Sequence, residues 1–130
     1  MSEYLITVNN LKKYFPIKKG LVKRTSGNVK AVDGVSFNIQ RGQILGIVGE
    51  SGCGKSTLGR TILRLLPPTG GEVFYEGKNV FNMSKREMNK MRTKMQIIFQ
   101  DPYSSLNPRL PVDDIVGEAM LQHGIVKNKK

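Results

Sequence analysis

Residues 49–57 read GESGCGKST, and this string sets the expected architecture of the chain. It matches the pattern G-x-x-x-x-G-K-[ST], which is typical of phosphate-binding loops. An almost continuously apolar run at 43–48 precedes it and predicts a strand that is covered on both faces. Leu58, Ile62 and Leu65 follow it at the spacing of one helix face. The sequence therefore predicts a strand, a glycine-rich loop and an amphipathic helix in that order.

The residue types in this string suit an anion. Glycines let the backbone approach a ligand closely, and successive N–H groups form a nest to which the helix N-terminus adds its positive dipole end. Lys55 would supply a charge for the β- and γ-phosphates, Ser56 a ligand for Mg²⁺, and Thr57 a hydrogen bond to the α-phosphate. A glycine-rich turn with a surface lysine is the alternative. The nucleotide-binding residues expected here are Gly49, Ser51, Gly52, Cys53, Gly54, Lys55, Ser56 and Thr57.

Cys53 is the one cysteine of the chain, so no internal disulfide can form. A single cysteine fits a reducing, cytoplasmic setting. Its place at a helix N-terminus beside Lys55 is typical of reactive thiols. The alternative, which we favour, is a small residue whose backbone matters and whose sulfur does not.

Composition indicates an ordinary globular protein with a strong positive charge. The 130 residues are 38% hydrophobic and 24% charged, and the net charge is +11. No acidic residue lies between Glu3 and Asp33, and 78–94 is a second basic stretch. Such a balance is found in proteins that bind nucleic acid or anionic membranes, but solvated loop and helix faces are the interpretation that we favour. The apolar runs are far shorter than the about 20 residues that span a bilayer.

The remaining elements are predicted from alternation, spacing and turn residues. Residues 9–30 are polar and basic, which predicts a loop with an extended middle. Ser84 and Glu87 form a possible capping box at the start of a helix, in which methionines would pack into the core. The other expected elements are strands at 4–8, 35–39, 72–75 and 96–99, a turn at 41–42, a loop at 100–111 and a helix at 113–123 that ends at Gly124. This order predicts an α/β fold with a mixed sheet.

Three segments resemble the ATP-binding subunits of ABC transporters, and in particular the second ATPase subunit of oligopeptide and dipeptide importers. They are residues 11–17, residues 31–57 and residues 96–109, the last of which contains the string FQDPYSSLNPR. The resemblance covers essentially the whole chain and implies a P-loop NTPase-type fold. It identifies residues 1–130 as the N-terminal part of a nucleotide-binding domain.

The resemblance also implies roles for single residues. Gln100 is similar to the Q-loop glutamine, which contacts Mg²⁺ and the attacking water and links the site to the membrane subunits. Phe15 is similar to the A-loop aromatic that stacks on adenine, and Tyr14 is the neighbouring candidate. His123 does not match the switch histidine of the family and is expected to face solvent. The catalytic residues expected on this basis are Lys55 and Gln100, and the metal ligands are Ser56 and Gln100.

The chain departs from the family pattern in three ways. It contains no signature loop of the Leu-Ser-Gly-Gly-Gln type, no apolar strand that ends in Asp-Glu, and no switch histidine. The resemblance implies ATP hydrolysis that drives peptide import, with permease subunits and a second ATPase subunit at the inner face of the cell membrane and a peptide-binding protein as an indirect partner. For this chain alone, weak MgATP binding and negligible turnover are expected. A small kinase or GTPase and a nucleic-acid binder are the alternatives.

Overall fold

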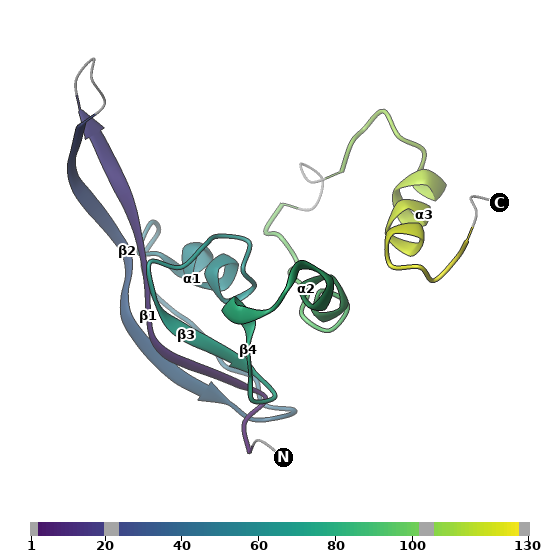
Figure 1. Cartoon of the computed structure of the whole chain (residues 1–130). Helices are drawn as coiled ribbons and strands as arrows, with labels where there is room; N and C mark the ends of the chain where they lie inside the picture. The colour runs from purple at the N-terminus through teal and green to yellow at the C-terminus, as the bar shows by residue number, and fades with distance from the viewer. Residues whose placement is uncertain (1–2, 20–23, 102–105, 128–130) are drawn as a thin grey trace. The chain divides into compact units, whose positions relative to one another are not determined.

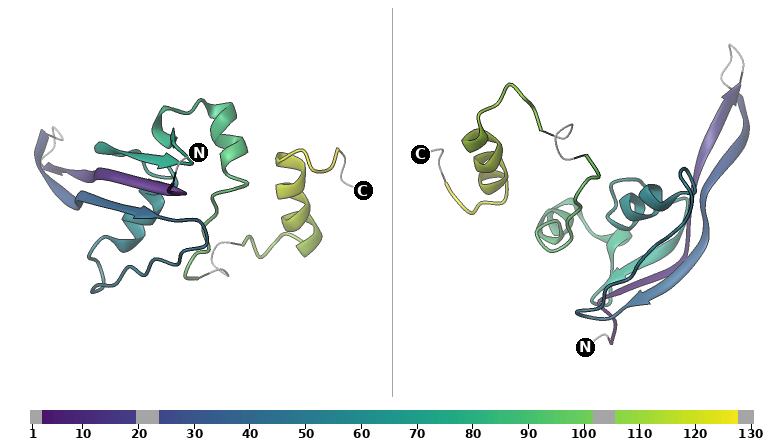
Figure 2. Two further views of the ribbon diagram at one scale, coloured as in Figure 1. Left: turned by 90° about the horizontal axis from the view of Figure 1, so that it is seen from below. Right: turned by 180° about the vertical axis from the view of Figure 1, so that it is seen from behind.

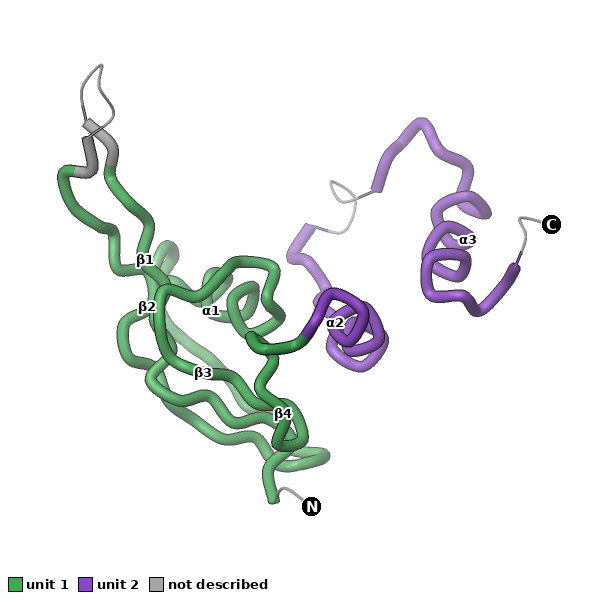
Figure 3. The backbone as a smooth tube through the Cα atoms, viewed as in Figure 1, with its two compact units in different colours: residues 1–83 green, residues 84–130 purple. Residues whose placement is uncertain are grey.

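The computed structural model describes residues 3–19, 24–101 and 106–127. The chain divides into two compact units, residues 1–83 and residues 84–130 (Figure 3). The first unit holds a sheet, helix α1 (Lys55–Ile62) and a short 3-10 helix η1 (Val80–Asn82). The second unit holds helices α2 (Lys85–Met91) and α3 (Val112–Gln122). Sheet and helices together confirm the predicted α/β class.

The sheet has four strands in the order β2-β1-β3-β4. Their bounds are β1 (Ile6–Lys19), β2 (Arg24–Ile39), β3 (Gly70–Tyr75) and β4 (Lys78–Asn79). β1 pairs antiparallel with β2 and β3, and β3 pairs antiparallel with β4. β1 and β2 run side by side as a long bent ribbon, with α1 beside it (Figures 1 and 2). Every strand pairing in the described ranges is therefore antiparallel, and the parallel strands of a mixed sheet are not formed there.

The predicted loop at 9–30 is wrong, because most of it lies in the β1–β2 hairpin. The predicted strands at 4–8 and 35–39 largely coincide with the open end of that hairpin, away from the connecting turn. Register shifts interrupt the pairing, one of them between Val8 and Leu11, where Asn10 has φ of 47°, and another opposite Gly34, where φ is 76°. Such bulges insert a residue and break the alternation that marks a strand in sequence. The many basic residues of the segment also interrupt the alternation of apolar and polar residues that would predict a strand.

One face of the sheet forms the core of the first unit. Val8 and Leu11 of β1 are fully buried, as is Val73 of β3. Val8 lies opposite Val73, and these residues share a face because side chains alternate along a strand. Leu58 of α1 is also buried, and α1 packs against β1 and β2. Burial of this apolar face holds the helix against the ribbon.

Two predicted strands do not form. Residues 43–48 are irregular and exposed, with Ile44 at 95% and Val48 at 93% of full exposure. Residues 96–99 are likewise irregular, and Ile98 is 94% exposed. A strand needs a neighbour for its N–H and C=O groups, and no strand of the described residues pairs with either segment. Their apolar sequence alone does not make them strands.

The turn and cap predictions are confirmed. Gln43 donates its backbone N–H to Gln40, which closes the turn at 41–42. A further turn at Glu76 and Gly77, which both have positive φ, closes the β3–β4 hairpin. Ser84 and Glu87 form the capping box of α2. Helix α3 ends as expected just before Gly124, whose φ is 69°.

Helix α1 ends earlier than Pro67 requires. Its last residue is Ile62, and Arg64 takes a left-handed conformation with φ of 52°. The N–H of Leu65 then donates to the carbonyl of Arg60, which gives this carbonyl of the last helical turn a hydrogen-bond partner. Leu65 therefore lies beyond the helix and is 39% exposed, whereas Leu58 is buried as the pattern predicts. Met88 and Met95 of the second unit are buried, which supports the core interpretation of the methionine stripe.

Candidate nucleotide-binding site

The loop 49–57 leads directly into α1 and is shaped by its glycines. Gly54 is the N-cap of α1 and has φ of 101°, a left-handed conformation that favours glycine. A Cβ on Gly54 would lie 2.1 Å from the backbone oxygen of Ala31, so the loop packs directly on β2. Only glycine fits this position without moving the strand or the loop.

The first turn of α1 presents backbone N–H groups at the end of the loop. The first intrahelical bond runs from the N–H of Leu58 to the carbonyl of Gly54, at 2.8 Å. The N–H groups of Lys55, Ser56 and Thr57 precede it and have no partner within the helix. They lie at the positive end of the helix dipole. This arrangement can bind an anion such as a phosphate group.

Lys55 folds back over the loop. Its Nζ donates to the carbonyl oxygens of Gly49 at 2.7 Å and Glu50 at 2.6 Å. The Nζ also lies 3.5 Å from the Sγ of Cys53. The structure thus brings the two ends of the predicted loop together through its lysine. A lysine ammonium has three donors, and it is a point charge that can bind the oxygens of a phosphate chain.

The other predicted loop residues differ in exposure. Ser56 is exposed at the start of α1, which leaves its hydroxyl accessible to a ligand. Thr57 is half-buried, and its carbonyl accepts a hydrogen bond from the hydroxyl of Thr61 at 2.7 Å. Cys53 is exposed, and a Cβ on Gly49 would lie 2.7 Å from its Sγ. Glycine at position 49 therefore leaves room for the cysteine.

Tyr14 and Phe15 are neighbours on β1 and lie on opposite faces of the ribbon. The hydroxyl of Tyr14 donates to the carboxylate of Asp33, and Lys30 forms an ion pair with the same carboxylate at 3.1 Å. The hydrogen bond from Tyr14, followed by that from Lys30, lowers the pKa of Asp33. The same contact with Asp33 raises the pKa of Tyr14 and of Lys30. Phe15 lies on the face that carries Leu11, is 38% exposed and keeps ring surface accessible.

Gln100 is exposed and follows the irregular segment 96–99 in the second unit. Gln100 belongs to the second unit and the loop to the first, and its assignment as metal ligand and catalytic residue stays a prediction. Residues 102–105 of the string FQDPYSSLNPR lie outside the described residues. His123 is exposed at the C-cap of α3, as expected for a residue that faces solvent.

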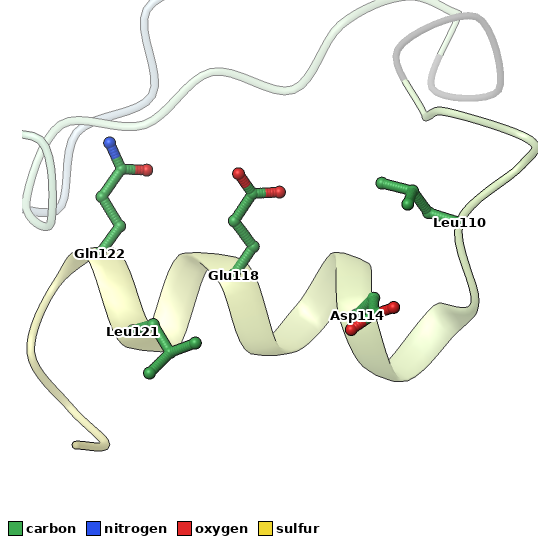
Figure 4. Close-up of a pocket in the computed structure, with 5 residues that line it drawn as sticks. All are labelled: Leu110, Asp114, Glu118, Leu121 and Gln122. Atoms are coloured by element: carbon green, nitrogen blue, oxygen red, sulfur yellow. The ribbon is translucent and has the colours of Figure 1, made fainter. Parts of the chain in front are cut away.

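A hollow in the second unit is lined by Leu110 and residues of α3 (Figure 4). Two of its lining side chains, Asp114 and Glu118, are carboxylates. Carboxylates repel the negative charge of a phosphate chain. This hollow is therefore unsuited to a nucleotide, and the loop before α1 remains the candidate site.

Sequence reasoning missed two groups, one beside the loop and one beside Phe15. One is the backbone oxygen of Ala31, which no residue pattern could place against Gly54. The other is Lys13, a residue that is only 9% exposed and has its Nζ 4.9 Å from the centre of the Phe15 ring. Its position two residues before Phe15 was a usable signal, because residues i and i+2 share a face of a strand. The expected loop at 9–30 concealed that signal.

Among residues 3–19, 24–101 and 106–127, no helix combines the length and the apolar character that crossing a bilayer requires.

Comparison with known proteins places the chain in a family. The profile of the ABC transporter family matches residues 32–129. The oligopeptide transport ATP-binding protein AppF of Bacillus subtilis is 48% identical over 124 residues, which is 95% of this chain and 38% of that protein. The dipeptide transport ATP-binding protein DppF of Escherichia coli is 47% identical over 121 residues, which is 93% of this chain and 36% of that protein. The chain thus spans well under half the length of these relatives.

Solved structures show the same similarity. A dimeric bacterial ABC transporter cassette has a TM-score of 0.69 at 28% identity and matches 89% of this chain and 47% of its own. A dimeric ATP-binding cassette in a post-hydrolysis state, bound to ADP and Pi, has a TM-score of 0.56 at 30% identity and matches 67% of this chain and 34% of its own. The family match over most of the chain agrees with the glycine-rich loop and helix α1 described above. The chain belongs to the ABC transporter family and carries part of its ATP-binding cassette.

Proposed function

We propose that the chain binds MgATP through residues 49–57 and the first turn of α1. The observation that carries this proposal is the contact of Gly54 with Ala31, where a Cβ would lie 2.1 Å from the backbone oxygen. This contact holds the loop so that the N–H groups of Lys55, Ser56 and Thr57 face the same region. The loop has the residue types, the backbone conformation and the helix terminus that a phosphate chain needs.

Each side chain would bind a different part of MgATP. Lys55 would exchange its bonds to the loop carbonyls for bonds to the β- and γ-phosphates. Ser56 is exposed at the helix start and would bind the metal through its hydroxyl, as Gln100 would through its amide oxygen. Bound Mg²⁺ neutralises charge on the phosphate oxygens. Phe15 would stack on adenine, and its accessible ring supports it over Tyr14, whose hydroxyl is held by Asp33.

The whole protein would use ATP hydrolysis to drive peptide import. The names of AppF and DppF, which are 48% and 47% identical to this chain, support this substrate class. Its partners would be permease subunits in the membrane and a second ATP-binding subunit, with a peptide-binding protein acting indirectly. It would lie in the cytoplasm, at the inner face of the cell membrane. Lys55, the loop N–H groups and Gln100 would stabilise charge and orient water during attack on the γ-phosphate.

For the 130-residue chain alone we propose weaker activity. Its sequence has no Leu-Ser-Gly-Gly-Gln string and no apolar strand that ends in Asp-Glu. The acidic group that would polarise water is thus missing from this chain. The chain would bind MgATP and turn it over negligibly.

The test is a titration of the chain with a fluorescent ATP analogue, competed by unlabelled ATP, GTP and DNA. Wild type should bind the analogue, and Lys55→Ala should bind it at least about tenfold less tightly, since hydrogen bonds to charged groups contribute about 1.5–3 kcal/mol. Equal binding by both proteins would overturn the proposal. Preference for GTP would favour a GTPase, and binding of DNA that survives Lys55→Ala would favour a nucleic-acid binder.

A further inference from the structure

Lys13 has a largely buried side chain beside the predicted adenine-binding ring. It retains 9% of its exposure, although lysine is among the residues that are almost never fully buried without a partner. Within the part of the chain that the structure describes, no ion pair or hydrogen bond of its ammonium group is found. Its recorded partner is the ring of Phe15, whose centre lies 4.9 Å from Nζ. An ammonium held this way lacks a counter-charge.

The backbone places Lys13 close to the loop. Lys13 lies opposite Val32 in the β1–β2 ladder. Ala31 directly precedes Val32 on β2, and its backbone oxygen is the atom against which Gly54 packs. Lys13 is therefore one strand away from the strand that touches the loop, at a separation of about 5 Å between paired Cα atoms.

Lys13 also shares a face with Phe15. The two residues are two positions apart on β1, and the register shift between Lys13 and Tyr14 leaves its extra residue, Ala31, on β2. Lys13 is buried on the face of Leu11, whereas Lys12 lies opposite Asp33 on the other face. Its ammonium thus lies beside the predicted adenine-binding ring, on the strand next to the one that contacts the phosphate-binding loop.

We propose that Lys13 is a further nucleotide-binding residue, which binds the phosphate nearest the ribose. This inference rests on the proposed function. Phe15 would hold the base and the loop would hold the outer phosphates, so a cation beside the ring, on the strand next to the one that contacts the loop, would meet the α-phosphate. The phosphate would supply an anionic partner for an ammonium that has no ion pair among the described residues. Lys55 serves the outer phosphates and Lys13 serves the inner one.

The experiment measures competition of adenosine, AMP and ATP against a fluorescent ATP analogue. Lys13→Met keeps an unbranched apolar side chain in the buried position, and Lys12→Met removes the same charge on the opposite face. Lys13→Met should weaken AMP and ATP by about tenfold, the loss of one charge-assisted hydrogen bond, and leave adenosine within about twofold. Lys12→Met should leave all three nearly unchanged.

The outcomes separate the two proposals. Equal weakening by Lys13→Met and Lys12→Met, or equal loss of adenosine and AMP, overturns the role of Lys13. If Lys55→Ala loses ATP while Lys13→Met keeps it, the role of Lys13 fails and the proposed function stands. If the wild-type chain binds no nucleotide, both fail.

A second measurement uses the wild-type chain, so it tests the proposal even if the Lys13→Met protein does not fold. MgATP should slow the acylation of Lys13 by a small amine-reactive acylating reagent several-fold, as measured by peptide mass spectrometry. Lys12 is the internal control and should react at an unchanged rate. Unchanged acylation of Lys13 at saturating MgATP would contradict the proposal.

Discussion

The ammonium nitrogen of Lys55 lies 2.7 Å from the carbonyl oxygen of Gly49, six residues earlier in the chain. This hydrogen bond joins the first glycine of the loop to the lysine at the start of α1. The loop is therefore held in a closed arrangement by its own side chain. Phosphate binding would exchange carbonyl partners for stronger anionic ones, so the loop needs little reorganisation.

Gly54→Ala should destabilise the first unit. The left-handed φ of 101° is strained for alanine and costs about 1–3 kcal/mol. The contact of 2.1 Å with the oxygen of Ala31 adds to that cost because both partners are backbone. Urea unfolding measures the change in the free energy of unfolding.

Gly59→Ala is the matched control, in the same helix. A Cβ on Gly59 meets nothing within 4 Å, and its φ is not positive. Alanine there should stabilise the helix by about 0.5–1 kcal/mol. A Gly54→Ala protein as stable as wild type would contradict the packing of the loop on β2.

Leu11→Ala and Ile44→Ala should differ sharply in stability. Leu11 is fully buried, so its truncation should cost about 2–5 kcal/mol. Ile44 is 95% exposed, so its truncation should change stability by less than about 0.5 kcal/mol. Both are measured by urea unfolding. A large loss in Ile44→Ala would show that residues 43–48 form the buried strand that the sequence predicts.

Tyr14→Phe should raise the pKa of Asp33. The hydrogen bond from Tyr14 is the largest cause of its lowered pKa, so the carboxylate should titrate nearer the ordinary value of 3.8. Because the folded pKa is lowered, this carboxylate adds stability above its ordinary pKa, and the gain is lost as pH falls through the folded value. A carbon-detected NMR titration of the carboxyl group follows the change.

The two other members of this cluster act at the opposite end of the pH range. The raised pKa values of Tyr14 and Lys30 give stability that is present below their ordinary values and lost as pH rises through the folded ones. Lys30→Met should also raise the pKa of Asp33, because it removes both a hydrogen bond and a positive charge. An unchanged pKa of Asp33 in Lys30→Met would contradict the role of this ion pair.

Local sequence signals predicted local structure well. The capping box of Ser84 and Glu87, the turn at 41–42 and the glycine-rich loop before α1 all form as expected. Each depends on residues within a few positions of one another. Their physical causes, such as a side-chain cap or a positive φ, are written in a short stretch of sequence.

Features that depend on distant residues were not predictable. The β1–β2 hairpin is masked by bulges at Asn10 and Gly34, whose extra residues shift the alternation. Residues 43–48 have the composition of a strand, but a strand also needs a pairing partner. The contacts of Gly54 with Ala31 and of Lys13 with Phe15 depend on the ladder register, which a single sequence does not reveal.

The most direct test is a set of ¹H–¹⁵N spectra of the chain during titration with MgATP. We expect the largest shifts at the backbone amides of Gly52, Gly54, Lys55, Ser56 and Thr57. Lys55→Ala should reduce these shifts at the same MgATP concentration, and residues of α3 should not respond. Amides of 49–57 that stay unchanged at millimolar MgATP would contradict the claim that this loop binds the phosphates.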